Sequence, residues 1–385
     1  EMMRCLLRSR PRVCLVTATP LTFREALRDH LQRLAQSYEV SAVSNFTPGD
    51  NVSAWLPGIR TIPIMIARDI APTADLAALA RLYQLFSCEP FDLVHSVTPK
   101  AGLLTMSAAR LAGVPRRVHC FTGQVWATRK GAARTILKSA DRITAANATH
   151  LLADSHSQRD FLLAEGVGRR IDVLANGSIS GVDVVRFRPD AAARTRIRTE
   201  QGIPDNACVI LFLGRLNRDK GVLDLAHAFA AIAVHQPHAW LLSVGPDEGG
   251  VHAEIESILG VFRDRVRLVG FTTEPESYMA ASDIFALPSY REGFGSVIIE
   301  AAACGVPAIA SRIYGLTDAV VDGSSGLLHT PGEASELAER MSRLIVDDEL
   351  RHRLGAAALV RAREHFTTNT VVDAMSGYYA RLLSQ

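Results

Sequence analysis

The chain has 385 residues, of which 48% are apolar and 21% are charged, and its formal net charge is +2. These values describe an ordinary folded protein that is long enough for two domains. No apolar run reaches the roughly 18 to 20 residues of a membrane span, and the apolar part of EMMRCLLRSRPR is too short for a secretory signal. The six cysteines form no C-x-x-C pair, which argues against a zinc site or a disulfide framework and favours a reducing cytoplasm.

Short β-branched runs alternate with helical patterns along the first half of the chain. Strands are predicted at Arg12–Thr17, Glu39–Ser44, Arg60–Ile66, Asp92–Ser96, Arg117–Phe121, His150–Asp154 and Ile171–Ala175. Helices are predicted between them, at Phe23–Gln36, Ala74–Ser87, Lys100–Ala112, Gly131–Ala146 and Ser157–Glu165. This alternation predicts an α/β fold with a parallel sheet covered by helices on both faces.

The second half repeats the alternation after an interruption. Arg186-Phe187-Arg188-Pro189 breaks the pattern, so a domain boundary is expected between Asp183 and Asp205. Further strands are predicted at Cys208–Leu213, Ala239–Val244, Val266–Val269, Ile284–Leu287 and Ala308–Ser311. Ligands of open α/β sheets bind beyond the carboxyl ends of strands, and these ends are therefore the places to look for a site.

The charge is unevenly distributed between the two halves. Residues 1–190 carry 24 Lys and Arg against 16 Asp and Glu, whereas residues 191–385 carry 18 against 24. Within the basic half, the segment Gln124–Arg142 mixes Trp126, Ile136 and Leu137 with five cations. Such a segment can lie on an anionic membrane, and it can equally be a helix that packs on a sheet with solvated cations.

A first group of chemically active residues follows the strand that begins the second half. In VILFLGRLNRDKGVLDLAHAF, an apolar strand ends at Gly214, and a loop carries Arg215 and Lys220 before a helix opens at Gly221. A guanidinium and an ammonium at this place suit the two phosphates of a diphosphate. The loop is neither a Walker P-loop nor a G-x-G-x-x-G dinucleotide fingerprint, since both patterns are absent.

A second group lies in DIFALPSYREGFGSVIIEAAACGVPAIAS. Glu292 sits in a glycine-bearing loop after a strand, and Glu300 falls about one turn into the helix that this loop opens. The free N–H groups of a helix start suit a phosphate, and a neighbouring carboxylate can accept hydrogen bonds from sugar or ribose hydroxyls. This segment therefore predicts a site for a phosphorylated sugar.

Together, the two groups resemble the retaining family-4 glycosyltransferases of GT-B architecture. The matching residues are Gly214-Arg215, Lys220-Gly221, Gly245, Gly270-Phe271, Glu292-Gly293-Phe294-Gly295 through Glu300, Cys304-Gly305-Val306-Pro307, Asp322-Gly323 and Gly326-Leu327-Leu328. The resemblance implies two Rossmann-like domains that face each other across a cleft, at residues 1–190 and 191–365. It also implies that residues 366–385 form a helix, about Asn369–Leu383, that crosses back to the first domain.

The resemblance further implies a role for each matching residue. Arg215, Lys220 and Glu292 are expected to carry catalysis. Donor binding is expected to involve Glu300 on the ribose and the main chain near Phe294 and Gly295 on the sugar and distal phosphate. Gly270 and Phe271 are expected near the base, although Phe271 can equally be a core residue.

In the first half the resemblance is closer to bacterial enzymes that extend lipid-linked oligosaccharides, of capsule or O-antigen type. It places Thr122, Gly123 and Asn176 near the donor, and we expect Thr19, Lys100 and Trp126 on the acceptor side. Many members carry a glycine pair where this chain reads Thr17-Ala18-Thr19, and a histidine directly before the glycine of Thr122-Gly123. His119 lies three residues earlier within a predicted strand and is more simply a core histidine.

The sequence thus predicts a glycosyltransferase that moves a sugar from a nucleoside-diphosphate donor, with UDP favoured, to a lipid-linked saccharide. Retention of the anomeric configuration, no metal or other cofactor and no nucleic acid partner are expected, with a cytoplasmic location on the inner face of a bacterial membrane. The alternatives are a soluble acceptor, a nucleotide-sugar epimerase of the same fold, and an inactive nucleotide-sugar-binding partner. The oligomeric state, the donor sugar and the acceptor hydroxyl are left open.

Overall fold

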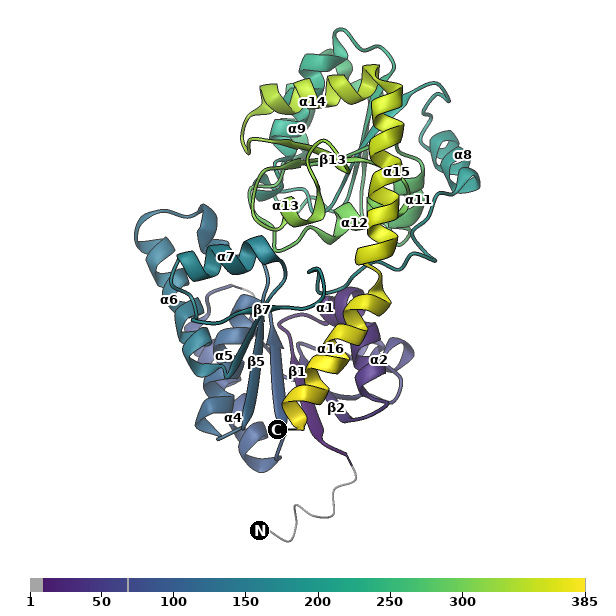
Figure 1. The fold of residues 1–385 in the computed structure, drawn as a ribbon. Helices are drawn as coiled ribbons and strands as arrows, with labels where there is room; N and C mark the ends of the chain where they lie inside the picture. Colours follow the sequence, from purple (N-terminus) through teal and green to yellow (C-terminus); the bar gives the residue numbers. More distant parts are fainter. Residues whose placement is uncertain (1–9, 68, 385) are drawn as a thin grey trace. The chain divides into compact units, whose positions relative to one another are not determined.

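The computed structural model describes residues 10–67 and 69–384, which divide into two compact units. Unit 1 consists of the residues up to Ser180 together with the C-terminal residues from Thr368. Unit 2 consists of Gly181–Thr367. Each unit is built around one parallel β-sheet with helices packed against it (Figure 1).

Unit 1 contains a seven-stranded sheet in the order β3-β2-β1-β4-β5-β6-β7. Its strands are β1 (Arg12–Val16), β2 (Glu39–Ser44), β3 (Arg60–Pro63), β4 (Leu93–Val97), β5 (Arg116–Phe121), β6 (His150–Ala153) and β7 (Asp172–Val173). Its longer helices are α2 (Arg28–Leu34), α4 (Pro72–Cys88), α5 (Pro99–Leu111), α6 (Gly131–Asn147), α7 (His156–Ala164) and α16 (Thr368–Leu383). The short α1 (Pro20–Thr22) continues into a π-helical turn at Phe23–Leu27, and α3 spans Val52–Trp55.

The alternation of side chains along β1 explains why this sheet is covered on both faces. Val13 and Leu15 belong to one buried cluster, with residues of α2 and α16. Cys14 and Val16 belong to another, with residues of α4 and α5. Because successive strand residues point to opposite faces, a run that is apolar at every position requires a helical layer on each side.

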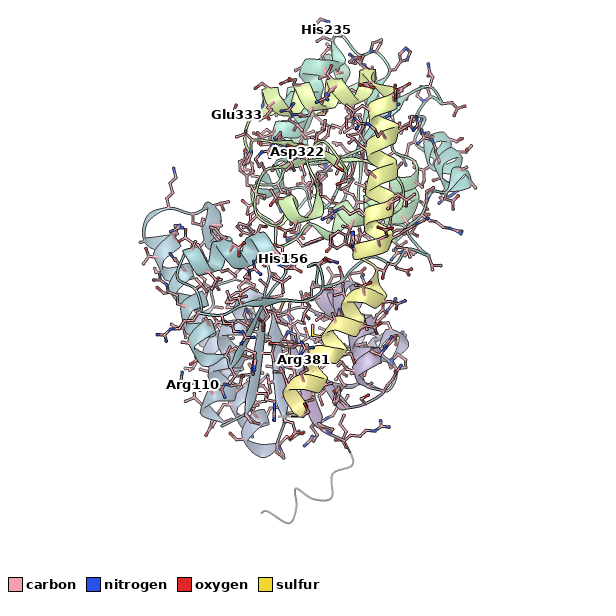
Figure 2. All side chains as sticks on the ribbon, in the orientation of Figure 1. Arg110, His156, His235, Asp322, Glu333 and Arg381 are labelled. Atoms are coloured by element: carbon pink, nitrogen blue, oxygen red, sulfur yellow. The ribbon has the colours of Figure 1, made fainter. Side chains whose placement is uncertain are left out.

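The C-terminal helix α16 supplies part of the first of these clusters. Met375, Tyr378, Tyr379 and Leu382 are all buried in it, and the Tyr379 hydroxyl lies 2.7 Å from Nδ1 of His95 on β4. Arg381, labelled in Figure 2, lies on the same helix with its guanidinium 5.6 Å from the Tyr378 ring centre. The C-terminal helix therefore packs on the first unit, as the family resemblance implies.

Unit 2 contains a six-stranded sheet in the order β10-β9-β8-β11-β12-β13. Its strands are β8 (Cys208–Leu213), β9 (Ala239–Val244), β10 (Val266–Val269), β11 (Ile284–Leu287), β12 (Ala308–Ser311) and β13 (Gly326–His329). Its helices are α8 (Ala191–Glu200), α9 (Val222–Ala233), α10 (His252–Leu259), α11 (Pro275–Ala280), α12 (Ser296–Ala303), α13 (Leu316–Ala319), α14 (Ala334–Val346) and α15 (Asp348–His365).

Both sheets have the strand order of a doubly wound nucleotide-binding fold, and the predicted class of two parallel-sheet α/β domains is confirmed. In such a sheet the order reverses at one point, where successive connections leave on opposite faces. In unit 2 this point lies between β8 and β11, which pair directly through Ile210 and Ile284. The loops that follow β8 and β11 carry the two groups of residues singled out in the sequence.

The compact units divide ten residues before the boundary of 190 that the sequence suggests. The reason lies in residues 181–190, which pack with unit 2. The Val182 N–H donates to the Phe366 carbonyl oxygen at 2.8 Å, and Phe187 is buried in the core of unit 2. Arg186 also pairs with Glu276 on α11 at 2.8 Å.

Candidate active site in unit 2

The loops after β8 and β11 hold each other in place. Gly221 ends the first loop with a φ of +68°, and a Cβ there would lie 2.0 Å from the carbonyl oxygen of Pro288 in the second. The Tyr290 N–H donates to the Asp219 carbonyl oxygen at 2.9 Å, and the Arg291 guanidinium lies 3.1 Å from the Asp219 carboxylate. Only glycine fits this close approach, so the two loops hold each other in a fixed arrangement.

This fit brings Lys220 and Glu292 together. Lys220 Nζ lies 2.5 Å from Glu292 Oε1, and the two side chains are only 21% and 13% exposed. Lys220 closes a single 3-10 turn (Arg218–Lys220), and its own N–H donates to Oδ1 of Asn217, the residue before the turn, at 3.2 Å. Ser289 Oγ donates to the same Glu292 oxygen at 2.8 Å. A cation for a phosphate and a carboxylate for a sugar hydroxyl therefore lie side by side.

Arg215 lies on the same loop but in a more open environment. Its guanidinium pairs with Glu248, on the loop after β9, at 2.9 Å, and both side chains are about two-fifths exposed. Such solvated pairs contribute little to stability. Arg215 can therefore exchange the Glu248 carboxylate for ligand oxygens at low cost.

The start of α12 is shaped by two close approaches. Gly295 precedes the helix with a φ of +81°, and a Cβ there would lie 2.4 Å from Leu316 Cδ2. The Phe294 side chain is fully buried, with its ring centre 5.2 Å from that of Phe366. The core thus takes up the side chain of Phe294, so any role of this residue toward a donor falls to its main chain. Glu300 is half-buried in the second turn of α12.

Gly270 and Phe271 follow β10, next to the Gly245 loop. The Gly245 N–H lies 2.9 Å from the Val269 carbonyl oxygen and 3.1 Å from that of Gly270. Phe271 is 66% exposed. The alternative interpretation of Phe271 as a core residue is therefore wrong, and its ring is available at the carboxyl edge of the sheet.

The expected donor residues of unit 1 lie at the carboxyl ends of β5 and β7. The Thr122 carbonyl oxygen accepts hydrogen bonds from Nε2 of Gln124 at 2.6 Å and of Gln158 at 2.5 Å, and these bonds fix the strand exit before Gly123. Asn176 is exposed in a turn in which Ala175, Gly177 and Ser178 have φ of +49°, +93° and +67°. A left-handed Ala and Ser are costly, and such strain collects at functional sites.

His119 is a core residue, as its place in a strand suggests. It is buried, and its Nδ1 lies 2.8 Å from Ser96 Oγ. Burial lowers the pKa of His119 to about 3. A Cβ on Gly102 would lie 2.3 Å from the His119 ring, so the histidine is packed directly against helix α5.

The three residues expected on the acceptor side have different environments. Thr19 caps α1 by accepting from the Leu21 N–H at 3.3 Å, and Lys100 pairs with Asp75 at 2.6 Å. Trp126 is buried, with its ring 5.3 Å from that of Phe161 and its indole N–H donating to Asp141 at 2.7 Å. Burial raises the pKa of Asp141 to about 6. The expectation that Trp126 contacts an acceptor has no support in this packing.

Sequence reasoning missed Ser289 and Glu248. Each acts on a predicted residue across a turn or between loops, and no periodic pattern marks such a contact. The one available signal was the place of Ser289 in the Leu287-Pro288-Ser289 step, between a buried strand and the glycine loop.

Two family models match the chain. The model described as Glycosyl transferases group 1 matches residues 193–361, and the Glycosyl transferase 4-like domain matches residues 4–177.

Curated relatives cover most of the chain. The capsular polysaccharide biosynthesis glycosyltransferase CapM of Staphylococcus aureus is 30% identical over 325 residues, which is 84% of this chain and 85% of CapM. A D-inositol 3-phosphate glycosyltransferase of Arthrobacter is 30% identical over 79% of this chain and 74% of its own length. The UDP-Gal:alpha-D-GlcNAc-diphosphoundecaprenol alpha-1,3-galactosyltransferase of Escherichia coli is 28% identical over 74% of each chain.

Solved structures agree on the fold. Sucrose-phosphate synthase from Thermosynechococcus elongatus has a TM-score of 0.82 at 22% identity, covering 97% of this chain and 100% of that one. HepE of Anabaena, in complex with UDP and glucose, has a TM-score of 0.80 at 21% identity, covering 96% and 100%. The chain therefore belongs to the family-4 glycosyltransferases of GT-B fold. It is a glycosyltransferase that uses a nucleotide sugar.

Proposed function

We propose that the protein transfers a sugar, with retention of anomeric configuration, from a UDP-sugar to a lipid-linked saccharide during the synthesis of a bacterial surface polysaccharide. The observation that carries the proposal is the pairing of Lys220 and Glu292 at 2.5 Å, at the point where the unit 2 sheet reverses its strand order. This pair joins a group suited to a phosphate to a group suited to a sugar hydroxyl. A donor that contains both chemical features matches it.

The proposed chemistry places positive charge where negative charge develops. As the bond between the anomeric carbon and the diphosphate oxygen breaks, the leaving UDP gains charge on its terminal phosphate. Arg215 and Lys220 stabilise this charge together with the N-terminal end of α12, and such preorganised groups contribute most when water is excluded. The departing phosphate oxygen then takes the proton of the acceptor hydroxyl, and the acceptor oxygen bonds to the anomeric carbon on the face that UDP leaves.

We propose that this reaction needs no metal ion, because two side-chain cations and a helix terminus of unit 2 are available to neutralise the charge of a diphosphate. Glu292 orients the sugar through its hydroxyls, and Glu300 holds the ribose. Phe271, exposed at the sheet edge, supplies an apolar surface for the base.

The relatives support a lipid-linked acceptor. The Escherichia coli relative is named for a diphosphoundecaprenol-linked acceptor, and CapM is named for capsule synthesis. The basic side of unit 1 is consistent with an anionic membrane surface. Arg129 and Lys130 are exposed before α6, and Ile136 and Ile143 on that helix are 65% and 50% exposed.

None of the helices in the described part of the chain combines the length and the apolar character that a membrane crossing requires. The proposal is accordingly a peripheral contact, on the inner face of a bacterial membrane. A soluble acceptor is the alternative that the relatives also support, since one of them is named for D-inositol 3-phosphate.

The test measures release of UDP, or of GDP, from a panel of nucleotide sugars with three acceptor conditions. These are an undecaprenyl-diphosphate saccharide in vesicles, inositol phosphate in solution, and water alone as the background. Turnover that depends on the lipid saccharide supports the proposal. Turnover with inositol phosphate and not with the lipid saccharide would show that the acceptor is a soluble molecule. Interconversion of the donor sugar without release of nucleotide would identify an epimerase, and binding without either reaction would identify an inactive partner.

A further inference from the structure

The carboxylate of Glu292 is held by one of its two oxygens. Lys220 Nζ at 2.5 Å and Ser289 Oγ at 2.8 Å both donate to Oε1. Among the described residues of the chain, no donor reaches Oε2. The carboxylate therefore has a defined orientation, with one oxygen occupied by the protein and the other left for a ligand.

Ser289 cannot change its position without moving both loops of the site. It is fully buried, directly after β11 and Pro288. The carbonyl oxygen of the preceding Pro288 lies against Gly221, and the N–H of the following Tyr290 donates to the Asp219 carbonyl oxygen at 2.9 Å. The main chain is thus fixed on both sides of Ser289, and its hydroxyl points at one acceptor.

The two donors to Oε1 differ in what else they can do. Lys220 has three N–H bonds, so two of them can still donate to a diphosphate. The Ser289 hydroxyl has one proton, and it donates that proton to Glu292. Removing Ser289 would leave Glu292 tied only to a flexible four-carbon side chain. A carboxylate that orients a reacting sugar loses efficiency when its own support is loose, because small misplacements at the reacting centre are felt in the transition state.

We infer that Ser289 is a positioning residue for the donor sugar: it fixes Glu292 so that Oε2 faces a sugar hydroxyl. The inference rests on the proposed function, since it assumes a nucleotide-sugar donor in this site. Its specific consequence is that Ser289 serves the sugar and not the nucleotide. A residue that only fills a buried space would affect both in the same way.

The test compares UDP with a UDP-sugar in the variant Ser289→Ala. The sugar is the one that the wild-type protein binds best among UDP-glucose, UDP-galactose and UDP-N-acetylglucosamine. We expect the Kd of the variant for UDP to stay within about twofold of the wild-type value. We also expect the variant to lose the tighter binding of the UDP-sugar over UDP. The kcat should fall about tenfold, the scale of one hydrogen bond to a charged group.

A matched control is available in the same unit. Ser282 is also buried, and its hydroxyl donates to the Tyr278 carbonyl oxygen at 2.7 Å, away from both loops. Ser282→Ala should change stability without changing the ratio of the two Kd values. In a Glu292→Gln background, Ser289→Ala should cause little further loss of kcat, because the group that it positions has already been altered.

Each outcome decides one question. If Ser289→Ala keeps the wild-type ratio and kcat, or loses UDP and UDP-sugar binding equally, the positioning role is wrong. If the wild-type protein itself binds UDP and every UDP-sugar alike, or none of them, the failure lies in the proposed donor site and the role of Ser289 falls with it. The Thr variant separates loss of the hydroxyl from a change in packing, since Ser289→Thr keeps the donor and should retain the ratio.

Discussion

The two units share a strand order but not a distribution of charged side chains. In unit 2 the loops on either side of the reversal between β8 and β11 carry Arg215, Lys220 and Glu292, two of them held in a close pair. In unit 1 the equivalent reversal lies between β1 and β4, and it is followed by Thr17, Thr19 and Thr98. The histidines of β4 and β5, His95 and His119, are buried in the core instead. The same topology thus supports a charged site in one unit and a hydroxyl-rich edge in the other, because function depends on the loops and not on the sheet.

The largest expected effect is the loss of a cation from the unit 2 loop. Arg215→Ala and Lys220→Ala should each lower kcat at least about 100-fold, as expected for one preorganised electrostatic contact. Arg218→Ala is the control on the same loop, since Arg218 is exposed and pairs with Glu254. It should retain kcat within about twofold in steady-state kinetics. Near-normal turnover of a folded Arg215→Ala or Lys220→Ala protein would contradict the diphosphate assignment of that residue.

In unit 1 a buried charged group should affect stability instead of catalysis. Burial raises the pKa of Asp141 to about 6 from 3.8, so the folded protein binds a proton that the unfolded chain releases. The stability from this group is therefore complete below pH 3.8 and is lost as the pH rises to about 6. Relative to the wild type, Asp141→Asn should gain about 2 kcal/mol between pH 4 and pH 7.

Chemical denaturation of both proteins at several pH values measures this difference. Asn keeps an oxygen acceptor for the Trp126 indole N–H, so the packing of the ring should be preserved. A difference in stability that stays constant across the pH range would show that the pKa of Asp141 is the same in the folded and the unfolded protein. Donor binding should be unchanged in either case.

Within unit 2 the two glutamates should be separable by kinetics. Glu300→Gln should chiefly raise the donor KM, because a contact to the ribose is equally present before and during the reaction. Glu292→Gln should chiefly lower kcat, by about tenfold, because it loosens the pair with Lys220 and the orientation of the sugar. Saturating acceptor and varied donor give both constants. The reverse pattern would exchange the two roles and leave the site itself in place.

The smallest expected effects concern the membrane contact of unit 1. Binding to anionic vesicles should weaken by about 1 kcal/mol for each of Arg129 and Lys130 that is neutralised, and it should decrease with salt. The control replaces Arg263 and Arg343, two exposed cations of unit 2, and removes the same amount of charge. It should weaken vesicle binding less than the loss of Arg129 and Lys130 does. Arg134 and Lys138 are poorer targets, because both pair with Glu165. Binding that is absent at low salt, or independent of salt, would favour a soluble acceptor.

The sequence predicted most of the strands and the two charged loops, because both are local patterns, but it did not predict β13. The predicted strands Glu39–Ser44, Cys208–Leu213 and Ala239–Val244 match β2, β8 and β9. Contacts between distant residues were not accessible in this way. The bond between Val182 and Phe366, one of the contacts that hold residues 181–190 to unit 2, leaves no trace in local periodicity.

Trp126 shows the same limit at a single residue. A tryptophan among five cations has the pattern of a surface segment, and the sequence does not show that Asp141 provides a buried partner for the indole N–H. The Ser289 contact was missed for a related reason, since its meaning depends on Lys220 arriving from a loop about 70 residues earlier in the sequence. Side-chain partners across loops are therefore the part of the site that only the structure supplies.

The return of α16 to unit 1 has a consequence for synthesis on the ribosome. Unit 2 is an insertion between two parts of unit 1, and four of the buried residues of unit 1, Met375, Tyr378, Tyr379 and Leu382, are made after the whole of unit 2. At translation rates of about 5 to 20 residues per second, the part of unit 1 that ends at Ser180 waits roughly 10 to 40 s for this helix. Unit 2, whose residues are contiguous, can be complete before then. During this interval the unit 1 sheet lacks the α16 side chains on that face, although α2 already covers part of it. The apolar surface left exposed is of the kind that nascent-chain chaperones bind.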